Sequence, residues 1–182
     1  MNLEKITTAL TSEINPEIKY NEKQKLAAVL IIIYDNPPKI LMTKKPKTMI
    51  QHGGEISFPG GKLINSDENL LETALRETKE ETGLLVSKDD IIGQLKQVTT
   101  LNSGFTILPF ICILDSITNL VANSEVESFL EIPLIPFLET LENDMDPKHN
   151  SIQEMYLFTF EKNIIWGASA RMLKQVMDYL SG

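Results

Sequence analysis

The sequence predicts a compact α/β sandwich, because two kinds of hydrophobic pattern are interspersed along one chain. Short apolar or alternating runs, rich in β-branched residues, occur between residues 26 and 167 and are typical of strands. Other stretches repeat their apolar residues every three or four positions, which is typical of amphipathic helices. At 182 residues the chain is long enough for one domain with a sizeable core.

The first 23 residues are predicted to form a helix and a linker. Leu3, Ile6, Leu10 and Ile14 recur at helical spacing, and Pro16 then ends the run. Such a helix can pack on the domain or support a homodimer, and the sequence does not choose between them. We therefore expect residues 1–23 to be an N-terminal helix and linker, and residues 24–182 to be the main domain.

The main domain is predicted to begin with a hairpin. Residues 26–34 form a continuous apolar run that favours a central strand, and residues 39–44 favour its neighbour after a proline-containing turn. The elements expected after residue 84 are strands at 91–100, 106–110, 125–132, 153–160 and 164–167, loops at 115–124 and 144–151, and helices from 133 to about 141 and from 168 to 180.

The stretch from Gly53 to Leu84 carries the chemistry of the chain. Glu77, Glu80 and Glu81 fall at i, i+3 and i+4, which places three like charges on one face of a helix. Repulsion gives the helix no stability from this cluster, so three acids alone would indicate only a solvated surface. A divalent cation with a preference for hard oxygen ligands, such as Mg²⁺, would make the arrangement favourable.

The flanking residues favour the functional interpretation. Phe58-Pro59-Gly60-Gly61 is a turn directly before the helix, where backbone without side chains can approach a ligand. Ser66 or Asp67 can cap the start of the helix, and Gly83 suits a left-handed residue at its end. Arg76 lies one turn from Glu72 and from Glu80, so it can brace the acidic face.

These residues resemble the Nudix box, whose second half reads Arg-Glu, an apolar residue, any residue, Glu-Glu, any residue, Gly and an apolar residue. Residues 76–84 match it throughout, except that Thr78 is less apolar than usual. In the first half, six residues rather than five separate Gly61 from Glu68. An inserted residue explains the difference, and either Asp67 or Glu68 can stand for the first acid.

A second resemblance, to the coenzyme A diphosphatase branch of that family, covers residues 41–61. Leu41-Met42-Thr43-Lys44-Lys45, Gly54 and Phe58 to Gly61 follow the branch motif in spacing. Lys45 replaces its first arginine, Pro46 its serine and Ile50 its second arginine. Lysine does not reproduce the planar fork of arginine, and isoleucine carries no charge, so recognition of the 3′-phosphate is expected to be weaker or supplied by Lys44, Lys47 or Lys62.

The resemblance implies a mixed sheet between helices and Mg²⁺- or Mn²⁺-dependent cleavage of coenzyme A, or its acyl or oxidised derivatives, to 3′,5′-ADP and a 4′-phosphopantetheine. It implies that Glu77 and Glu81 bind metal and that Arg76 orients the acids, while Glu80 is either a ligand or the catalytic base. Glu125, with Glu127 as runner-up, is the acid expected from outside the box. The residues expected to contact substrate are Lys44, Lys45, His52, Gly60, Gly61 and Phe105.

Two other functions stay open. The Lys45 and Ile50 substitutions favour another diphosphate, such as ADP-ribose, a dinucleotide or a damaged nucleoside triphosphate. A non-catalytic nucleotide-binding module is disfavoured, because Arg76, Glu77, Glu80 and Glu81 are intact. We expect a small-molecule nucleotide substrate in either enzyme.

Composition excludes some partners and locations. The net charge of −8 argues against a nucleic-acid-binding surface, which would carry a basic patch. No apolar run has membrane-spanning length, and no signal peptide pattern is seen, so a soluble cytoplasmic protein without a membrane partner is expected. The single cysteine, Cys112, lies between isoleucines and is expected to be buried in a strand without a catalytic role.

Overall fold

The computed structural model describes residues 1–17, 25–50, 52–100, 103–145 and 155–182. Its helices are α1 (Leu3–Leu10), α2 (Leu70–Thr82), α3 (Leu134–Leu138) and α4 (Gly167–Ser181), with a short 3-10 turn, η1 (Lys88–Asp90). Its strands are β1 (Lys25–Tyr34), β2 (Lys39–Lys44), β3 (Ile56–Ser57), β4 (Gly60–Lys62), β5 (Ile91–Gln94), β6 (Val98–Thr99), β7 (Phe105–Leu114), β8 (Ser128–Pro133), β9 (Glu142–Asn143), β10 (Tyr156–Phe160) and β11 (Asn163–Ile165).

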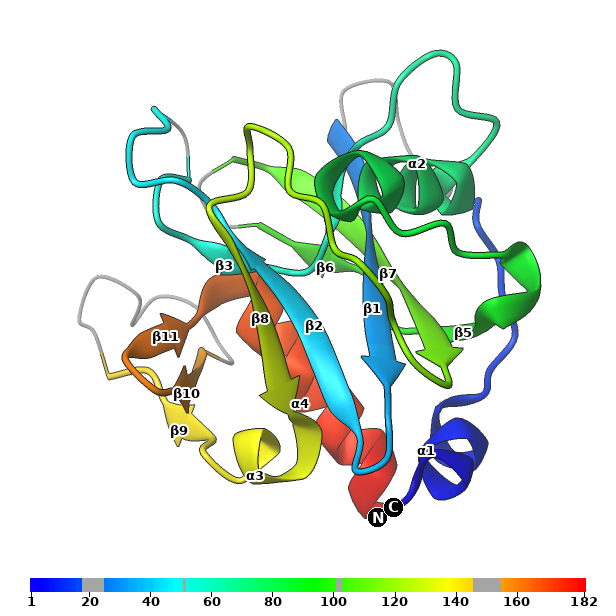
Figure 1. The fold of residues 1–182 in the computed structure, drawn as a ribbon, viewed down its shortest axis with the longest axis vertical. Coiled ribbons are helices and arrows are strands. Elements are labelled where there is room, and N and C mark those ends of the chain that lie inside the picture. The colour runs from blue at the N-terminus through cyan, green and yellow to red at the C-terminus, as the bar shows by residue number, and fades with distance from the viewer. Residues whose placement is uncertain (18–24, 51, 101–102, 146–154) are drawn as a thin grey trace.

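The large sheet is mixed and lies between helices, as predicted (Figure 1). Its central order is β3-β2-β1-β7-β5, with β4 also paired to β1, β6 to β7 and β8 to β2. The pairing of β1 with β7 is parallel, whereas the other recorded pairings are antiparallel. A small antiparallel sheet of β9, β10 and β11 lies beside it.

After its exposed first residue, Lys25, strand β1 is apolar because both of its faces are covered. Its even-numbered residues pack with Leu70 and Ala74 of α2, and its odd-numbered residues from Val29 onward pack with residues of α4 such as Leu173. Figure 1 shows α2 in front of the sheet and α4 behind it. A strand that is buried on both sides needs a continuous apolar run rather than an alternation, so the prediction of a central strand is confirmed.

The N-terminal helix packs on the domain. Ile6 and Leu10 belong to the core that includes α4, and both are buried. Beyond the helix, the Ser12 hydroxyl accepts a hydrogen bond from the Gln94 amide and donates one to the Gln94 carbonyl at the end of β5. The apolar stripe of α1 thus packs against the core of the same chain. The predicted linker runs into residues 18–24, which lie outside the described residues.

Several predicted strands differ in extent, and the strand predicted at 106–110 is longer, since β7 spans Phe105–Leu114. The strand predicted at 91–100 is divided into β5 and β6, since Leu95 reaches the carbonyl of Pro109, which has no N–H to continue the ladder. The strand predicted from Glu125 begins only at Ser128, because Asn123 turns the chain by accepting from the Glu125 amide. Strand β10 begins at Tyr156, and most of the predicted loop at 144–151 falls outside the described residues.

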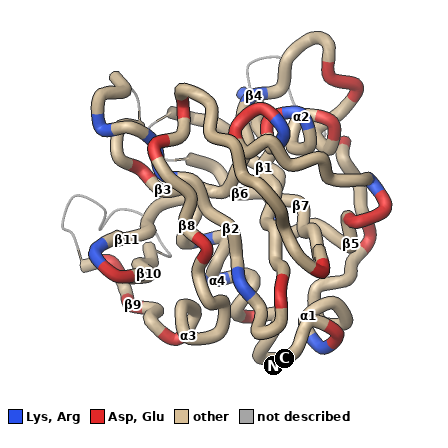
Figure 2. The backbone as a smooth tube through the Cα atoms, in the orientation of Figure 1, with Lys and Arg blue, Asp and Glu red and all other residues tan. Residues whose placement is uncertain are grey.

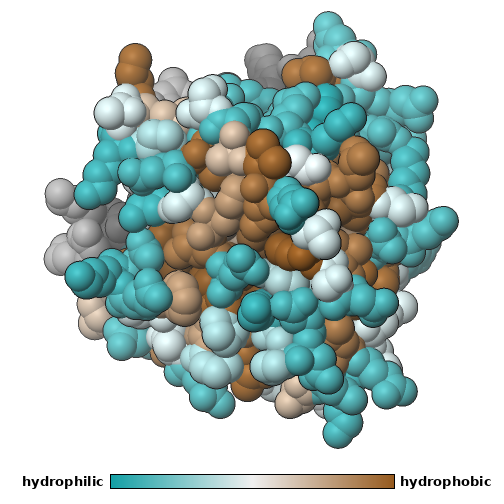
Figure 3. Space-filling view, in the orientation of Figure 1, coloured by the Kyte–Doolittle hydropathy of each residue, from teal (hydrophilic) through white to brown (hydrophobic). Residues whose placement is uncertain are grey.

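The loop between β7 and β8 crosses the α2 face of the sheet. Its Ile117 and Leu120 pack on the core beneath α2, and the Val121 amide donates to the Thr82 carbonyl at the end of that helix. Figure 3 shows apolar side chains gathered at the centre of this face. Further along the loop, the Glu127 amide donates to the Lys44 carbonyl, which fixes where Glu125 lies.

Two smaller expectations concern Cys112 and membranes. Cys112 is buried in β7, as predicted, and burial raises the pKa of its thiol to about 12. Within the described parts of the chain, no helix combines the length and the apolar character that crossing a bilayer requires.

Replacing Ile31 by alanine is expected to destabilise the fold by about 2–5 kcal/mol, because it leaves a cavity in a strand packed on both faces. Urea unfolding followed by circular dichroism measures the loss. Ile164→Ala is the matched control, since this isoleucine is 56% exposed in β11 and its truncation should cost less than about 1 kcal/mol. Equal losses for the two variants would contradict the central position of β1.

Candidate functional site

Helix α2 is fixed at both ends by its own sequence. Asn69 is the N-cap, and its side-chain oxygen accepts from the amides of Leu71 and Glu72 at 3.0 and 3.1 Å. The prediction that Ser66 or Asp67 caps the helix is therefore wrong. Gly83 ends the helix in the left-handed conformation with φ of 74°, as predicted, and its amide donates to the Lys79 carbonyl.

Asp67 binds the guanidinium of Arg76 instead of capping the helix. Arg76 Nε lies 2.8 Å from Asp67 Oδ1, and Nη2 lies 3.0 Å from Oδ2. The Asp67 side chain is only 4% exposed, so this paired contact is shielded from water. The hydrogen bond from Arg76 holds the pKa of Asp67 below its usual range. Sequence reasoning missed this contact because an acid just before a helix is first interpreted as a cap.

Arg76 also reaches the acidic face of α2. Its Nη1 donates to Glu77 Oε1 at 2.9 Å and to Glu80 Oε2 at 3.3 Å. The bracing predicted from the spacing is present toward Glu80, whereas Glu72 contacts Lys88 instead, and Asp67 holds the arginine in place on its other side. Figure 2 shows acidic and basic segments gathered along α2 beside β4.

Glu81 and Glu77 lie against the two glycines of β4. The Gly60 amide donates to Glu81 Oε2 at 3.1 Å, and a Cβ at Gly61 would collide with the Glu77 carboxyl group. Glu81 is buried, and burial raises its pKa to about 7. Burial also raises the pKa of Glu77, even though Arg76 opposes the shift.

Glu125 approaches the same cluster from the loop before β8. Lys45 Nζ lies 3.7 Å from Glu125 Oε2 and 3.9 Å from Glu81 Oε1, so the ammonium group lies between the two acids. Glu125 is about half exposed, whereas Glu81 is enclosed. The charges of Glu77 and Glu125 both raise the pKa of Glu81 further, which shows that the three carboxylates are close enough to repel.

The donor set suits a hard divalent cation, since it offers carboxylate oxygens from Glu77, Glu80, Glu81 and Glu125 beside exposed backbone. Their mutual repulsion and partial burial would be relieved by a positive ion. Within the described ranges, however, no three His, Cys, Asp or Glu side chains are already assembled around one point as metal ligands. Arg76 and Lys45 instead contact these carboxylates.

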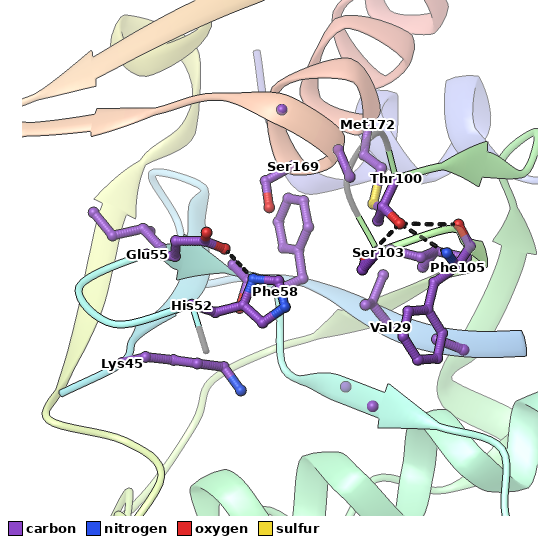
Figure 4. Close-up of a pocket in the computed structure, with 18 of the residues that line it drawn as sticks. Val29, Lys45, His52, Glu55, Phe58, Thr100, Ser103, Phe105, Ser169 and Met172 are labelled. Carbon is purple, nitrogen blue, oxygen red and sulfur yellow. Dashed lines mark hydrogen bonds and ion pairs between the residues drawn. The ribbon is translucent and has the colours of Figure 1, made fainter. Parts of the chain in front are cut away.

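A pocket of about 490 Å³ opens beside the glycines (Figure 4). One wall comes from the sheet and another from the start of α4, so residues far apart in sequence face each other. Figure 4 shows Phe58, Phe105 and Met172 around this space, with His52 and Lys45 on the side of the loop before β3. The apolar part of the wall is formed by Ala27, Val29, Ile56, Phe58, Phe105, Ile107, Trp166, Ala168 and Met172.

Most of the substrate-contact residues predicted from sequence reach this pocket. Its wall includes Lys45, His52, Gly60, Gly61 and Phe105. The His52 ring is held by Glu55, whose Oε2 lies 2.8 Å from Nδ1.

Two positions singled out in the sequence are outside this pocket. Lys44 donates to Asn163 Oδ1 at 3.1 Å and does not line the pocket, so the structure does not bring it to the predicted position. Ile50 is fully exposed. Trp166 and the start of α4 were missed as pocket residues, because they approach the glycines only through the tertiary fold.

Comparisons with known proteins agree with this geometry. Residues 24–163 match the NUDIX domain family. An uncharacterized Nudix hydrolase NudL from Yersinia enterocolitica is 34% identical over 159 residues, covering 85% of this chain and 81% of that protein. A NudL from Pectobacterium atrosepticum is 28% identical over 178 residues, covering 96% of this chain and 92% of that protein.

Solved structures show the same fold. A MutT/nudix family protein from Enterococcus faecalis superposes with a TM-score of 0.63 at 17% identity, covering 91% of this chain and 65% of that chain. The NUDIX domain of Shewanella oneidensis NrtR, solved with ADP ribose, superposes with a TM-score of 0.53 at 21% identity, covering 66% of this chain and 82% of that chain. The family match spans most of the chain, and the acids of the predicted box lie together beside its glycines. The chain therefore belongs to the Nudix hydrolase family, enzymes that act on the phosphoric anhydride bonds of nucleoside diphosphate derivatives.

Proposed function

We propose that this enzyme hydrolyses coenzyme A, or an acyl or oxidised derivative, to 3′,5′-ADP and a 4′-phosphopantetheine with Mg²⁺ or Mn²⁺. The observation that carries the proposal is the position of Gly60-Gly61, the end of the branch motif. These glycines lie between the carboxylates of α2 and a largely apolar pocket. A diphosphate above the glycines would meet the acidic cluster, while an uncharged arm of the substrate would enter the pocket. Its volume is within the roughly 300–1,000 Å³ usual for small-molecule sites.

The carboxylates divide into two roles in this proposal. Glu77 and Glu81 would hold the metal, because both lie directly against the glycines and both are partly or fully buried. Glu80 is more exposed, and it either adds a ligand or orients the attacking water. Glu125, on the neighbouring loop, would be a further metal ligand, and in this structure its carboxylate faces Lys45. When bound, the metal neutralises phosphate charge and lowers the pKa of a bound water.

The chain contributes binding, orientation and a proton acceptor. Water adds to one phosphorus of the diphosphate, the bridging P–O bond breaks, and the bridging oxygen leaves with the other phosphate. A carboxylate of the cluster takes the proton of the water. Arg76, anchored by Asp67, keeps Glu77 and Glu80 in place, and Lys45 supplies positive charge to the phosphate oxygens.

Another nucleoside diphosphate derivative is the second candidate. Two substitutions in the branch motif favour it, since Lys45 lacks the planar fork of arginine and Ile50 carries no charge. Ile50 also projects into solvent rather than toward the pocket. ADP-ribose is a natural member of a substrate panel, because it has the same central diphosphate without a 3′-phosphate.

Coenzyme A is expected to be the preferred substrate in a panel that also contains dephospho-coenzyme A, ADP-ribose and NADH. Chromatographic product analysis with Mg²⁺ or Mn²⁺ gives kcat/KM for each. Preference for coenzyme A over the dephospho form, with 3′,5′-ADP as product, supports the proposal. Equal or faster cleavage of ADP-ribose or NADH would reject coenzyme A and favour the second candidate.

Replacing Glu81 by glutamine is expected to lower kcat at least tenfold, and roughly a hundredfold if Glu81 both binds metal and aligns water. The amide oxygen can still accept from the Gly60 amide, so the melting temperature should change little. Glu72→Gln is the matched control on the same helix, because Glu72 contacts Lys88 outside the site. Unchanged turnover in the Glu81 variant would remove this residue from the mechanism.

The variant Gly61→Ala is expected to reduce turnover roughly tenfold or more while leaving the fold intact. The three atoms nearest to the added methyl group all belong to the end of the flexible Glu77 side chain, which would turn away from the diphosphate. A kinetic double-mutant cycle tests this cause: in a Glu77→Ala background the Gly61 substitution should have almost no further effect. Additive losses would show that Gly61 acts independently of Glu77.

A contrasting result is expected for the neighbouring glycine. A Cβ at Gly60 would meet the backbone of Ala28 and Val29, which cannot move without disturbing β1. The Gly60→Ala variant should therefore lower the melting temperature, whereas Gly61→Ala should not. Similar melting temperatures for both variants would contradict the distinction between backbone and side-chain contact.

A further inference from the structure

Two lysines share one aromatic ring at the edge of the pocket. Lys25 Nζ and Lys62 Nζ each lie 5.5 Å from the centroid of the Phe105 ring. The strand register explains the arrangement, because Lys25 is paired with Phe105 across β1 and β7, and Lys62 is paired with Ala27 across β1 and β4. Ala27, Lys62 and Phe105 all line the pocket.

Phe105 is held in place by the turn before β7. Its amide donates to Thr100 Oγ1 at 2.8 Å, and the Thr100 amide donates to the Phe105 carbonyl at 2.8 Å. Thr100 Oγ1 lies 2.7 Å from Ser103 Oγ, and the Ser103 carbonyl accepts weakly from Lys25 Nζ at 3.4 Å. The backbone that carries the ring is therefore held by hydrogen bonds, while Lys25 and Lys62 are exposed.

These lysines differ from Arg76, Lys45 and Lys44. Arg76 is bound to carboxylates, Lys45 faces Glu81 and Glu125, and Lys44 is bound to an amide. Neither Lys25 nor Lys62 has a carboxylate partner among the residues that the structure describes. Their ammonium groups lie at most twice 5.5 Å apart, so they repel each other, and the ring face offsets that repulsion only in part. A dianion between them would remove it.

We infer that Lys25 and Lys62, arranged around Phe105, bind the 3′-phosphate of the substrate and so determine the preference for coenzyme A over its dephospho form. This inference rests on the proposed function and assigns its specificity to residues outside the branch motif. Lys62 directly follows Gly61, so a nucleotide whose diphosphate lies over the glycines can place its 3′-phosphate beside Lys62. The charge that Ile50 cannot supply thus comes from two neighbouring strands.

The test is the double variant Lys25→Met/Lys62→Met, in which methionine keeps much of the side-chain length and removes the charge. We expect the ratio of kcat/KM for coenzyme A to that for dephospho-coenzyme A to fall at least tenfold from wild type, since two charge-assisted contacts are lost. Lys62→Met alone should give an intermediate ratio. Lys5→Met, on the exposed face of α1, is the matched control and should keep the wild-type ratio.

A binding measurement complements the kinetics. Measured by calorimetry, the affinity of the double variant for 3′,5′-ADP should be at least tenfold lower than that of wild type. Its affinity for 5′-AMP, which lacks the 3′-phosphate, should fall much less. Similar losses for both coenzymes and both nucleotides would place the lysines on the diphosphate and overturn the inference. A wild-type enzyme that cleaves coenzyme A and dephospho-coenzyme A equally would overturn the inference alone. Cleavage of ADP-ribose but of neither coenzyme would overturn the proposed function as well.

Discussion

The pairing of β4 with β1 is the constraint on which the site depends. Ala28 pairs with Gly61 and Val29 with Gly60, on a strand whose two faces are covered by α2 and α4. Because the backbones approach so closely, only glycine fits at position 60. The same strand packs α2 through its even-numbered residues, so the acids of that helix come to lie beside the glycines. One buried strand thereby positions both halves of the motif.

Charge in the site is arranged in two layers. The shielded carboxylate of Asp67 pairs with Arg76, whose guanidinium also contacts Glu77 and Glu80 on α2. Glu81 lies deeper, where burial raises its pKa and, among the residues that the structure describes, the Gly60 amide and Lys45 balance its charge. An ion pair of this kind restricts side-chain geometry more than it stabilises the fold. The electrostatic repulsion among these carboxylates would be offset by a bound cation when the anionic substrate enters the site.

The pocket and the acidic cluster meet at Lys45 and along β4, where Gly60, Gly61 and Lys62 belong to the pocket wall and contact the side chains of α2. One side carries charge for phosphate chemistry, and the other offers apolar walls from β1, β7 and α4. This separation allows the reacting centre to stay constant while the walls determine which substrate fits. Specificity is accordingly expected from residues such as Phe105 and Lys62, which belong to strands and not to the acidic helix.

The sequence by itself determined the elements and the local motif. A run from residue 26 to 34 had to be a doubly buried strand, and the i, i+3 and i+4 acids had to share one face of α2, because these features depend on local periodicity. Only the tertiary structure decided that Asp67 binds Arg76 instead of capping, that Lys44 turns to Asn163, and that Trp166 and Lys25 approach the pocket. Some of those contacts join segments that are far apart in the chain, and others involve a side chain that has several possible partners of the same kind. Sheet register and packing determine both, because local sequence does not specify which distant residues meet.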